Sequence, residues 1–233
     1  MEQLHLREKE IFETLKLLKK NNFVVIGGYA VNAYALPRFS VDCDMVVKDN
    51  KEVEKIEIEL LKLGYIKIKR NFEIPYGGKF IRYEKRISGI FKVSMDIMVG
   101  NVVDRGTNAG FSAKWIFENS KLRNLKGKTI SENLKLRIIN PDALFVMKMI
   151  SCRPTDIRDI FLLIGFIRDK KWMQNQISGR VDFADRLKIV KKKISSKQFK
   201  DDLQGVFGII DPATFEKYKK MIFSLEKPDE NIK

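Results

Sequence analysis

The chain has 233 residues, of which 44% are hydrophobic and 10% aromatic, so it is not a disordered chain and is long enough to bury a core. Its 45 lysines and arginines exceed its 30 aspartates and glutamates by 15 (45 − 30), which favours acidic partners such as RNA, DNA, nucleoside triphosphates or an anionic lipid surface. A lysine-rich proteome would give the same balance, so charge alone does not choose the partner.

Cysteine and histidine content restricts the chemistry further. Cys43 and Cys152 both lie in apolar surroundings, which argues against a disulfide framework and indicates a reducing cytoplasm. His5 is the only histidine and lies near a terminus, which argues against a histidine zinc site or a histidine base. The charged opening segment does not resemble a secretory signal, and no apolar run reaches the roughly 18 residues of a membrane span. We therefore expect a cytoplasmic protein without a membrane partner.

The first 47 residues predict a helix, a strand, a short helix and a second strand. Residues 2–21 repeat apolar side chains at helical spacing, which is typical of a packing helix. Residues 23–26 form a short β-rich run. Residues 29–35 predict a short helix that ends before Pro37, because the residue before a proline disfavours the α region. The next strand is expected over residues 41–47.

This unit carries two features that together point to nucleotide chemistry. Gly27 and Gly28 allow a tight turn and a close approach of the backbone to a ligand, and a helix that follows such a turn favours a phosphate. On the second strand, Asp42 and Asp44 point to the same face because side chains alternate along a strand. Two adjacent carboxylates repel each other unless a cation or a basic group lies between them, and Mg²⁺ accepts such oxygen ligands.

The stretch resembles the nucleotidyltransferase superfamily typified by DNA polymerase β. The shared motif is a hydrophobic residue, two small residues, a spacer and Asp-x-Asp, here Gly27-Gly28, a spacer from residue 29 to residue 41, and Asp42-x-Asp44. The spacer is 13 residues long (41 − 29 + 1), at the long end of the family's range. The resemblance implies metal ligation by both aspartates and phosphate binding by the glycines.

The segment after the second aspartate strand predicts a helix and a hairpin. Residues 51–63 have helical periodicity, and Gly64 suits the C-terminal cap of that helix. Residues 65–74 and 80–86 predict two paired strands joined by a turn at residues 75–78. A phosphate loop is the alternative for the glycines of that turn, but no helix follows them.

Residues 91–99 predict a strand that buries its odd-numbered side chains. Asp96 is then the acidic residue on the other face, and the superfamily resemblance implies a third acidic residue on a strand beside Asp42 and Asp44. Its role would be metal ligation or deprotonation of the attacking hydroxyl group. A solvent-facing strand residue is the alternative, and Asp104 is the reserve candidate, in a less rigid loop.

Farther along, the pattern changes from strands to helices. Residues 100–120 predict an exposed loop followed by a short helix around Trp115, and residues 134–139 predict a strand. Pro141 suits the first turn of a helix. We therefore expect an α/β (α+β) fold, with a nucleotidyltransferase-type small mixed sheet in a catalytic domain over residues 1–139 and a helical domain over residues 140–233.

Residues 143–167 are mostly apolar but carry a spaced set of charges. Lys148 lies among apolar residues, so it either extends to the surface or reaches an anion. The order of Lys148, Arg153, Asp156 and Asp159 is similar to the second conserved region of the AbiEii family of abortive-infection nucleotidyltransferase toxins. That resemblance implies that the lysine contacts the nucleotide phosphates and that a downstream aspartate completes the site. The alternative is that Asp156 and Asp159 pair with Arg153 and Arg158 to fix the helix geometry.

The last third of the sequence is lysine-rich and predicts helices over residues 183–194, 198–207 and 212–225. The run from Lys191 to Lys193 is a solvated face or part of a nucleic-acid contact, and the sequence favours the solvated face. Residues after Lys227 are expected to fray.

Together these resemblances predict an enzyme that transfers a nucleoside monophosphate from a nucleoside triphosphate to a hydroxyl group, with Mg²⁺ or Mn²⁺ as cofactor. The acceptor expected is RNA or transfer RNA, in a type IV toxin with an antitoxin partner. The alternatives are an antibiotic nucleotidyltransferase and a non-catalytic nucleic-acid-binding module. The residues expected to be catalytic are Asp42, Asp44, Asp96 and Lys148, the three aspartates being metal ligands, and those expected to bind nucleotide are Gly27, Gly28, Arg38, Ser40, Lys148 and Asp159.

Overall fold

The structure is a computed structural model that describes residues 2–68 and 79–225. It divides into two compact units. The first comprises Met1–Ala33, Pro37–Val103 and Gly110–Asn140, and the second comprises Tyr34–Leu36, Asp104–Ala109 and Pro141–Lys233. The turn expected at residues 75–78 and the end of the strand before it lie outside the described residues, as do the residues expected to fray after Lys227.

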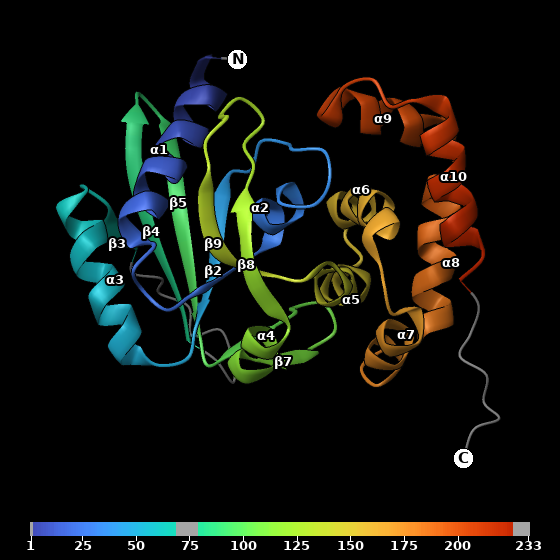
Figure 1. The fold of residues 1–233 in the computed structure, drawn as a ribbon, viewed down its shortest axis with the longest axis horizontal. Coiled ribbons are helices and arrows are strands. Elements are labelled where there is room, and N and C mark those ends of the chain that lie inside the picture. The colour runs from blue at the N-terminus through green and yellow to red at the C-terminus, as the bar shows by residue number, and fades with distance from the viewer. Residues whose placement is uncertain (1, 69–78, 226–233) are drawn as a thin grey trace. The chain divides into compact units, whose positions relative to one another are not determined.

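The first unit combines a mixed sheet with helices, of which α2 and α4 are short (Figure 1). Its elements are α1 (Glu2–Leu18), β1 (Val24–Ile26), α2 (Gly27–Asn32), β2 (Asp42–Val47), α3 (Asn50–Lys62), β3 (Ile66–Ile68), β4 (Lys79–Ser88), β5 (Phe91–Val99), β6 (Asn101–Val103), β7 (Gly110–Ser112), α4 (Ala113–Glu118), β8 (Ser120–Leu125) and β9 (Leu134–Ile139). In the described residues, seven strands form one sheet in the order β3-β4-β5-β2-β1-β9-β8, and β6 and β7 form a separate hairpin. The predicted α/β class is confirmed.

Parallel and antiparallel pairs place β2 in the middle of this sheet. β2 is antiparallel to β1 and parallel to β5, while β4 is antiparallel to β5. The helices α1 and α3 pack against each other and against β5. The apolar stripe of α1, which includes Ile11, Leu15 and Leu18, is fully buried, so the predicted packing helix is confirmed.

Several local predictions need correction. Helix α2 begins at Gly27 itself, so the two glycines form its first turn rather than a turn that precedes it. Residues 100–120, expected to be mostly loop, also contain the β6–β7 hairpin, and β8 was not predicted. In β5 both Ser94 and Asp96 are buried, so both faces of this strand are covered and the solvent-facing alternative for Asp96 is wrong. A polar face can be buried in this way when its groups pair with one another.

The second unit is helical around the segment that begins at Pro141. Its elements are α5 (Pro141–Ser151), α6 (Pro154–Leu163), the 3₁₀ turn η1 (Ile164–Phe166), α7 (Lys170–Ser178), α8 (Phe183–Ile194), α9 (Lys197–Phe207) and α10 (Pro212–Phe223) (Figure 1). Phe161 of α6 contacts the rings of Phe199 and Phe215, with centroids 5.3 and 4.9 Å away, and this aromatic cluster joins α6, α9 and α10. Among the described helices, none combines the length and apolar character that a membrane span requires.

Candidate active site

The first glycine of α2 lies directly against the second aspartate of β2. Gly27 has φ +66°, a left-handed conformation that favours glycine, and Ile26 pairs with Asp44 across β1 and β2. A methyl carbon on Gly27 would lie 2.9 Å from Cγ of Asp44 and closer still to its Oδ2. The lack of a side chain at Gly27 therefore lets the Asp44 carboxylate rest on the backbone at the start of α2.

The second glycine makes room for the turn that precedes β2. A methyl carbon on Gly28 would lie 2.5 Å from Oγ of Ser40 and 3.0 Å from Nη2 of Arg38. The backbone of Arg38 is fixed by Asn32, whose Nδ2 donates to the Arg38 carbonyl at 2.8 Å and whose Oδ1 accepts from the Arg38 N–H at 3.1 Å. Asn32 is fully buried, so these two hydrogen bonds satisfy a polar side chain inside the core.

The strand register places three aspartates on one face of the sheet. Asp44 pairs with Asp96 across β2 and β5, and Asp42 lies two residues from Asp44 on the same side of β2. The same register places Arg82 of β4 beside Asp96. The predicted acidic residues therefore do share a face, which we call the acidic face (Asp42, Asp44, Asp96), and a basic residue that was not predicted lies next to it.

Arg82 forms a two-point ion pair with Asp96. Its Nε donates to Oδ1 of Asp96 at 2.7 Å and its Nη2 donates to Oδ2 at 2.5 Å, while Nη2 lies 3.5 Å from Oδ2 of Asp42. The hydrogen bond to Asp96 raises the pKa of Arg82 despite partial burial, so the guanidinium stays charged. Across the described parts of the chain, no three acidic, histidine or cysteine side chains converge to hold a metal ion. The acidic face is thus not a preformed three-ligand site.

Cys43 lies between the two aspartates in sequence but on the opposite face of β2. Burial, followed by the charge of Asp44, raises the pKa of its thiol well above the usual value. Cys43 therefore stays protonated and packs as an apolar residue. Cys152 is also a free buried thiol, in agreement with the expected absence of a disulfide framework.

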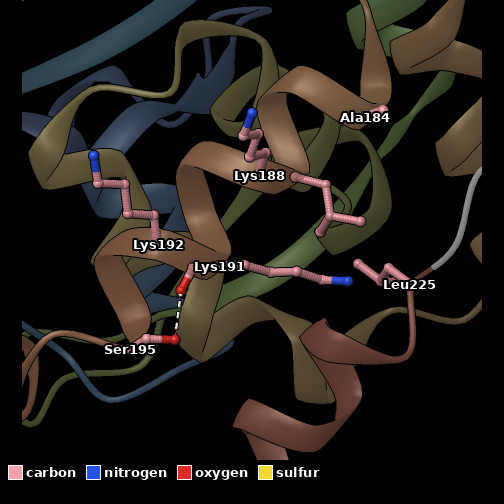
Figure 2. A pocket seen from close by; sticks show the side chains of 7 residues that line it. Ala184, Lys188, Lys191, Lys192, Ser195 and Leu225 are labelled. Atoms are coloured by element: carbon pink, nitrogen blue, oxygen red, sulfur yellow. Dashed lines mark hydrogen bonds between the residues drawn. The ribbon is translucent and has the colours of Figure 1, made fainter.

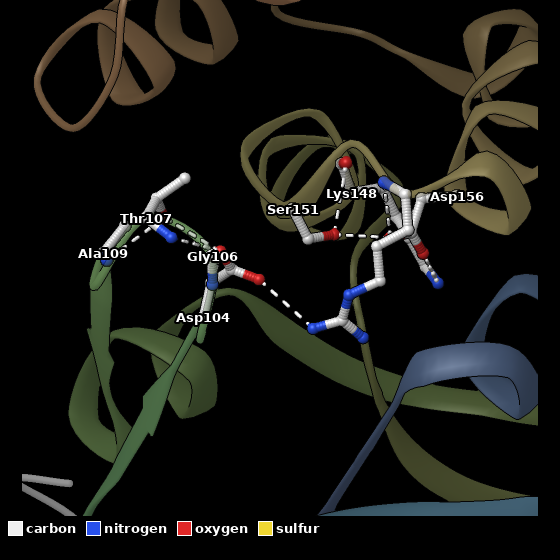
Figure 3. A network of polar contacts seen from close by, with 8 residues as sticks. Asp104, Gly106, Thr107, Ala109, Lys148, Ser151 and Asp156 are labelled. Carbon is white, nitrogen blue, oxygen red and sulfur yellow. Dashed lines mark hydrogen bonds and ion pairs between the residues drawn. The ribbon is translucent and has the colours of Figure 1, made fainter. Parts of the chain in front are cut away.

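In the second unit, Lys148 is the centre of a polar network (Figure 3). Its Nζ lies 2.7 Å from Oδ1 of Asp156 and 2.9 Å from Oδ2 of Asp159, and only 13% of its side chain is exposed. Burial lowers the pKa of Lys148, but the two carboxylates together raise it by more, so the ammonium stays charged. Asp156 also accepts a hydrogen bond from Oγ of Ser151 at 2.6 Å. The two aspartates therefore pair with Lys148, and Asp156 also accepts a hydrogen bond from the backbone N–H of Arg153 at 3.2 Å at the start of α6.

Two other charged residues singled out in the sequence, Arg153 and Asp104, pair with each other, with Nη2 of Arg153 3.3 Å from Oδ1 of Asp104. Oδ2 of Asp104 also accepts hydrogen bonds from the N–H groups of Gly106 and Thr107, at 3.1 and 2.9 Å. These contacts make Asp104 the anchor of its own turn. Asp104 belongs to the second unit and Asp96 to the first, so its part as the reserve for Asp96 stays a prediction.

A hollow of about 670 Å³ lies along α8, and lysines dominate its polar lining (Figure 2). The residues that line it are Ala184, Leu187, Lys188, Lys191, Lys192, Ser195 and Leu225. Leu187 and Leu225 are buried, so a ligand in the hollow would meet the lysines first. In the lysine run from residue 191 to residue 193, only Lys191 and Lys192 line the hollow, whereas Lys193 pairs with Asp202 at 3.1 Å.

Sequence reasoning missed two residues that organise the first unit, Asn32 and Arg82. Asn32 was read as part of an apolar helix, although an amide among apolar residues is itself a signal for a buried hydrogen-bonding role. Arg82 lies on the face of its strand that meets Asp96, but this follows only from the register between β4 and β5. The alternation of side chains along β4 does not by itself show which residue Arg82 pairs with.

The comparisons with known proteins support one family over nearly the whole chain. A family model described as "Nucleotidyl transferase AbiEii toxin, Type IV TA system" matches residues 12–231. No curated protein sequence matches the chain.

Among solved structures, the MenT4 nucleotidyltransferase toxin from Mycobacterium tuberculosis is similar, with a TM-score of 0.57 and 14% identity over 96% of this chain and 83% of that one. A nucleotidyltransferase structure from H. pylori, described as putative in its source, has a TM-score of 0.49 and 18% identity over 97% of this chain and 95% of that one. At these identities the MenT4 match supports the fold alone, and the fold is that of a nucleotidyltransferase.

Proposed function

Because this chain belongs to the AbiEii family of nucleotidyl transferase toxins and is therefore a nucleotidyltransferase, we propose that it transfers a nucleoside monophosphate from a nucleoside triphosphate to a hydroxyl group of RNA. The observation that carries the proposal is the packing of Gly27 against Asp44, which joins the start of a helix to a carboxylate pair. Phosphates bind at the start of a helix, and divalent cations bind a pair of carboxylates.

The donor set of the acidic face fits a magnesium or manganese ion. Asp42 and Asp44 offer carboxylate oxygens on one face of β2, and 36% of the Asp42 side chain is exposed. Mg²⁺ usually takes one or two protein carboxylates and completes its shell with water and phosphate oxygens. Asp42 and Asp44 would therefore hold the cation, and bound there it would supply positive charge that stabilises the attacking and leaving oxygens.

In the proposed reaction, the hydroxyl oxygen of the acceptor forms a bond to the α-phosphorus as the bond to the leaving pyrophosphate breaks. The backbone at Gly27 and Gly28, with Arg38 and Ser40, would orient the phosphates for in-line attack. The hydroxyl proton passes to a carboxylate of the acidic face, and the family resemblance offers Asp96 either for this role or for metal ligation. The contact of Lys148 with the nucleotide phosphates stays a prediction.

RNA is the proposed acceptor because the chain carries a formal charge of +15 and the α8 hollow presents lysines. Within the described residues, Lys188 and Lys192 are exposed and form no ion pair within 4.0 Å. Unpaired surface lysines bind the phosphate backbone of nucleic acid with little dependence on sequence. The type IV toxin family also supports an antitoxin as the biological partner, which would oppose the effect of the modification.

The experiment that tests this function compares two positions of the label. The protein is incubated with total cellular RNA, Mg²⁺ and each nucleoside triphosphate in turn, labelled either at the α-phosphate or at the γ-phosphate. We expect RNA to retain the α label and not the γ label, and chelation of the metal to abolish retention. Retention of the γ label would mean phosphoryl transfer instead, and retention of neither label would contradict an RNA acceptor. A parallel incubation with an aminoglycoside tests the alternative that the acceptor is a small molecule.

A further inference from the structure

Arg82 is positioned by strand pairing rather than by chance surface contact. It lies opposite Asp96 in the antiparallel register of β4 and β5, so its side chain extends along the same face as Asp96, Asp42 and Asp44. The side chain of Asp96 is 4% exposed, whereas that of Arg82 is 24% exposed. The guanidinium therefore covers a buried carboxylate and keeps contact with the more open side of the face.

The pairing uses both oxygens of Asp96. Nε and Nη2 of Arg82 donate to Oδ1 and Oδ2 at 2.7 and 2.5 Å, the fork geometry in which guanidinium and carboxylate bind most strongly. A metal ion that took Asp96 as a ligand would compete with this donor for the same oxygens. Arg82 also approaches Asp42 to 3.5 Å, so its positive charge lies near a second proposed ligand.

We propose that Arg82 is the built-in counter-cation of the acidic face, which stabilises the metal-free protein and competes with a divalent cation for Asp96 and Asp42. The inference rests on the proposed function, because it concerns the same metal site. Without metal, Arg82 neutralises a carboxylate that would otherwise be buried beside two others. With metal, its charge opposes the incoming cation, so metal affinity is set by the arginine as well as by the aspartates.

The test uses Mn²⁺ alone, without nucleotide, so that an effect on nucleotide binding does not enter. Free Mn²⁺ is followed by electron paramagnetic resonance, and thermal melting is measured in chelator and in saturating Mn²⁺. The variants are Arg82→Gln and the control Arg86→Gln, which removes the same charge from an exposed position four residues along β4. We expect Arg82→Gln to bind Mn²⁺ at least about tenfold more tightly than the wild type, since a repelling unit charge a few Å away is removed.

The melting data separate competition from simple structural support. Arg82→Gln should melt lower than the wild type in chelator and should gain more from Mn²⁺, whereas Arg86→Gln should behave as the wild type does. If Arg82→Gln fails to fold, Arg82→Lys replaces it. That variant keeps the charge but not the two-point fork, and it should show a smaller increase in affinity.

Two outcomes would overturn the inference in distinguishable ways. Equal or weaker Mn²⁺ binding by Arg82→Gln, with normal binding by the wild type, would overturn the competition and leave the proposed function intact. A lack of Mn²⁺ binding by the wild type and by every variant would overturn both this inference and the metal-dependent step of the proposed function.

Discussion

Replacement of Gly27 by alanine separates backbone strain from displacement of Asp44. Gly27 has φ +66°, and a left-handed conformation costs a residue with a side chain about 1–2 kcal/mol. The new methyl group would also overlap the Asp44 carboxylate, whose escape from its rotamer costs about 0.5–1.5 kcal/mol more. We therefore expect Gly27→Ala to lower the free energy of unfolding by about 1.5–3.5 kcal/mol, the sum of the two ranges.

Gly64 provides the matched control. Its φ is +83°, but the nearest atom to a methyl group there is Cε of Lys85 at 4.0 Å, so Gly64→Ala carries the backbone strain without the clash. Urea unfolding measures both stabilities, and Mn²⁺ titration measures the site. We expect Mn²⁺ binding to weaken at least about tenfold in Gly27→Ala and to remain unchanged in Gly64→Ala. Equal Mn²⁺ affinity in the two variants would refute the link between Gly27 and the Asp44 carboxylate.

The remaining predictions concern lysines of the second unit. Lys148→Met leaves two carboxylates without their counter-ion, so it should lower the free energy of unfolding by about 3–5 kcal/mol in a urea titration at pH 7. The pKa of Lys148 in the folded state is raised above 10.5, so the difference in free energy of unfolding between wild type and variant should persist below pH 10.5. It should shrink as the pH rises through the folded-state pKa. A difference that does not change with pH would contradict the ion pair. Lys188→Gln with Lys192→Gln should weaken RNA binding and reduce its logarithmic salt slope by about 2, whereas the exposed pair Lys170→Gln with Lys171→Gln, of equal charge, should not.

The part of the site that the sequence predicts is the part encoded by local geometry. A strand fixes which side chains share a face, so Asp42 and Asp44 were placed together from their spacing alone. The absence of side chains at Gly27 and Gly28 predicted a close approach of the backbone to a ligand, but neither the contact of Gly27 with Asp44 nor the exact start of α2. Two glycines were read as a turn that precedes the helix, whereas they form the first turn of α2 itself.

The part that the sequence does not predict depends on pairing between distant segments. Arg82 meets Asp96 only because β4 and β5 adopt one register out of several that their alternation allows. Lys148 was predicted to contact a nucleotide, and pairing of Asp156 and Asp159 with arginines was left as an alternative, because helical spacing alone does not show which charges face each other across α5 and α6. Such choices are made by burial, because a carboxylate in the interior needs a cation or hydrogen-bond donors beside it.

The central claim is that the aspartate pair of β2 serves transfer of a nucleoside monophosphate to RNA. The most direct test is the retention of the α-phosphate label in RNA by the wild type and by Asp44→Asn, at equal concentrations of folded protein and saturating Mg²⁺. The amide keeps the size of the side chain but removes the charge proposed to hold the cation, so retention should fall at least about a hundredfold. Equal retention by Asp44→Asn and the wild type would contradict the assignment of this site.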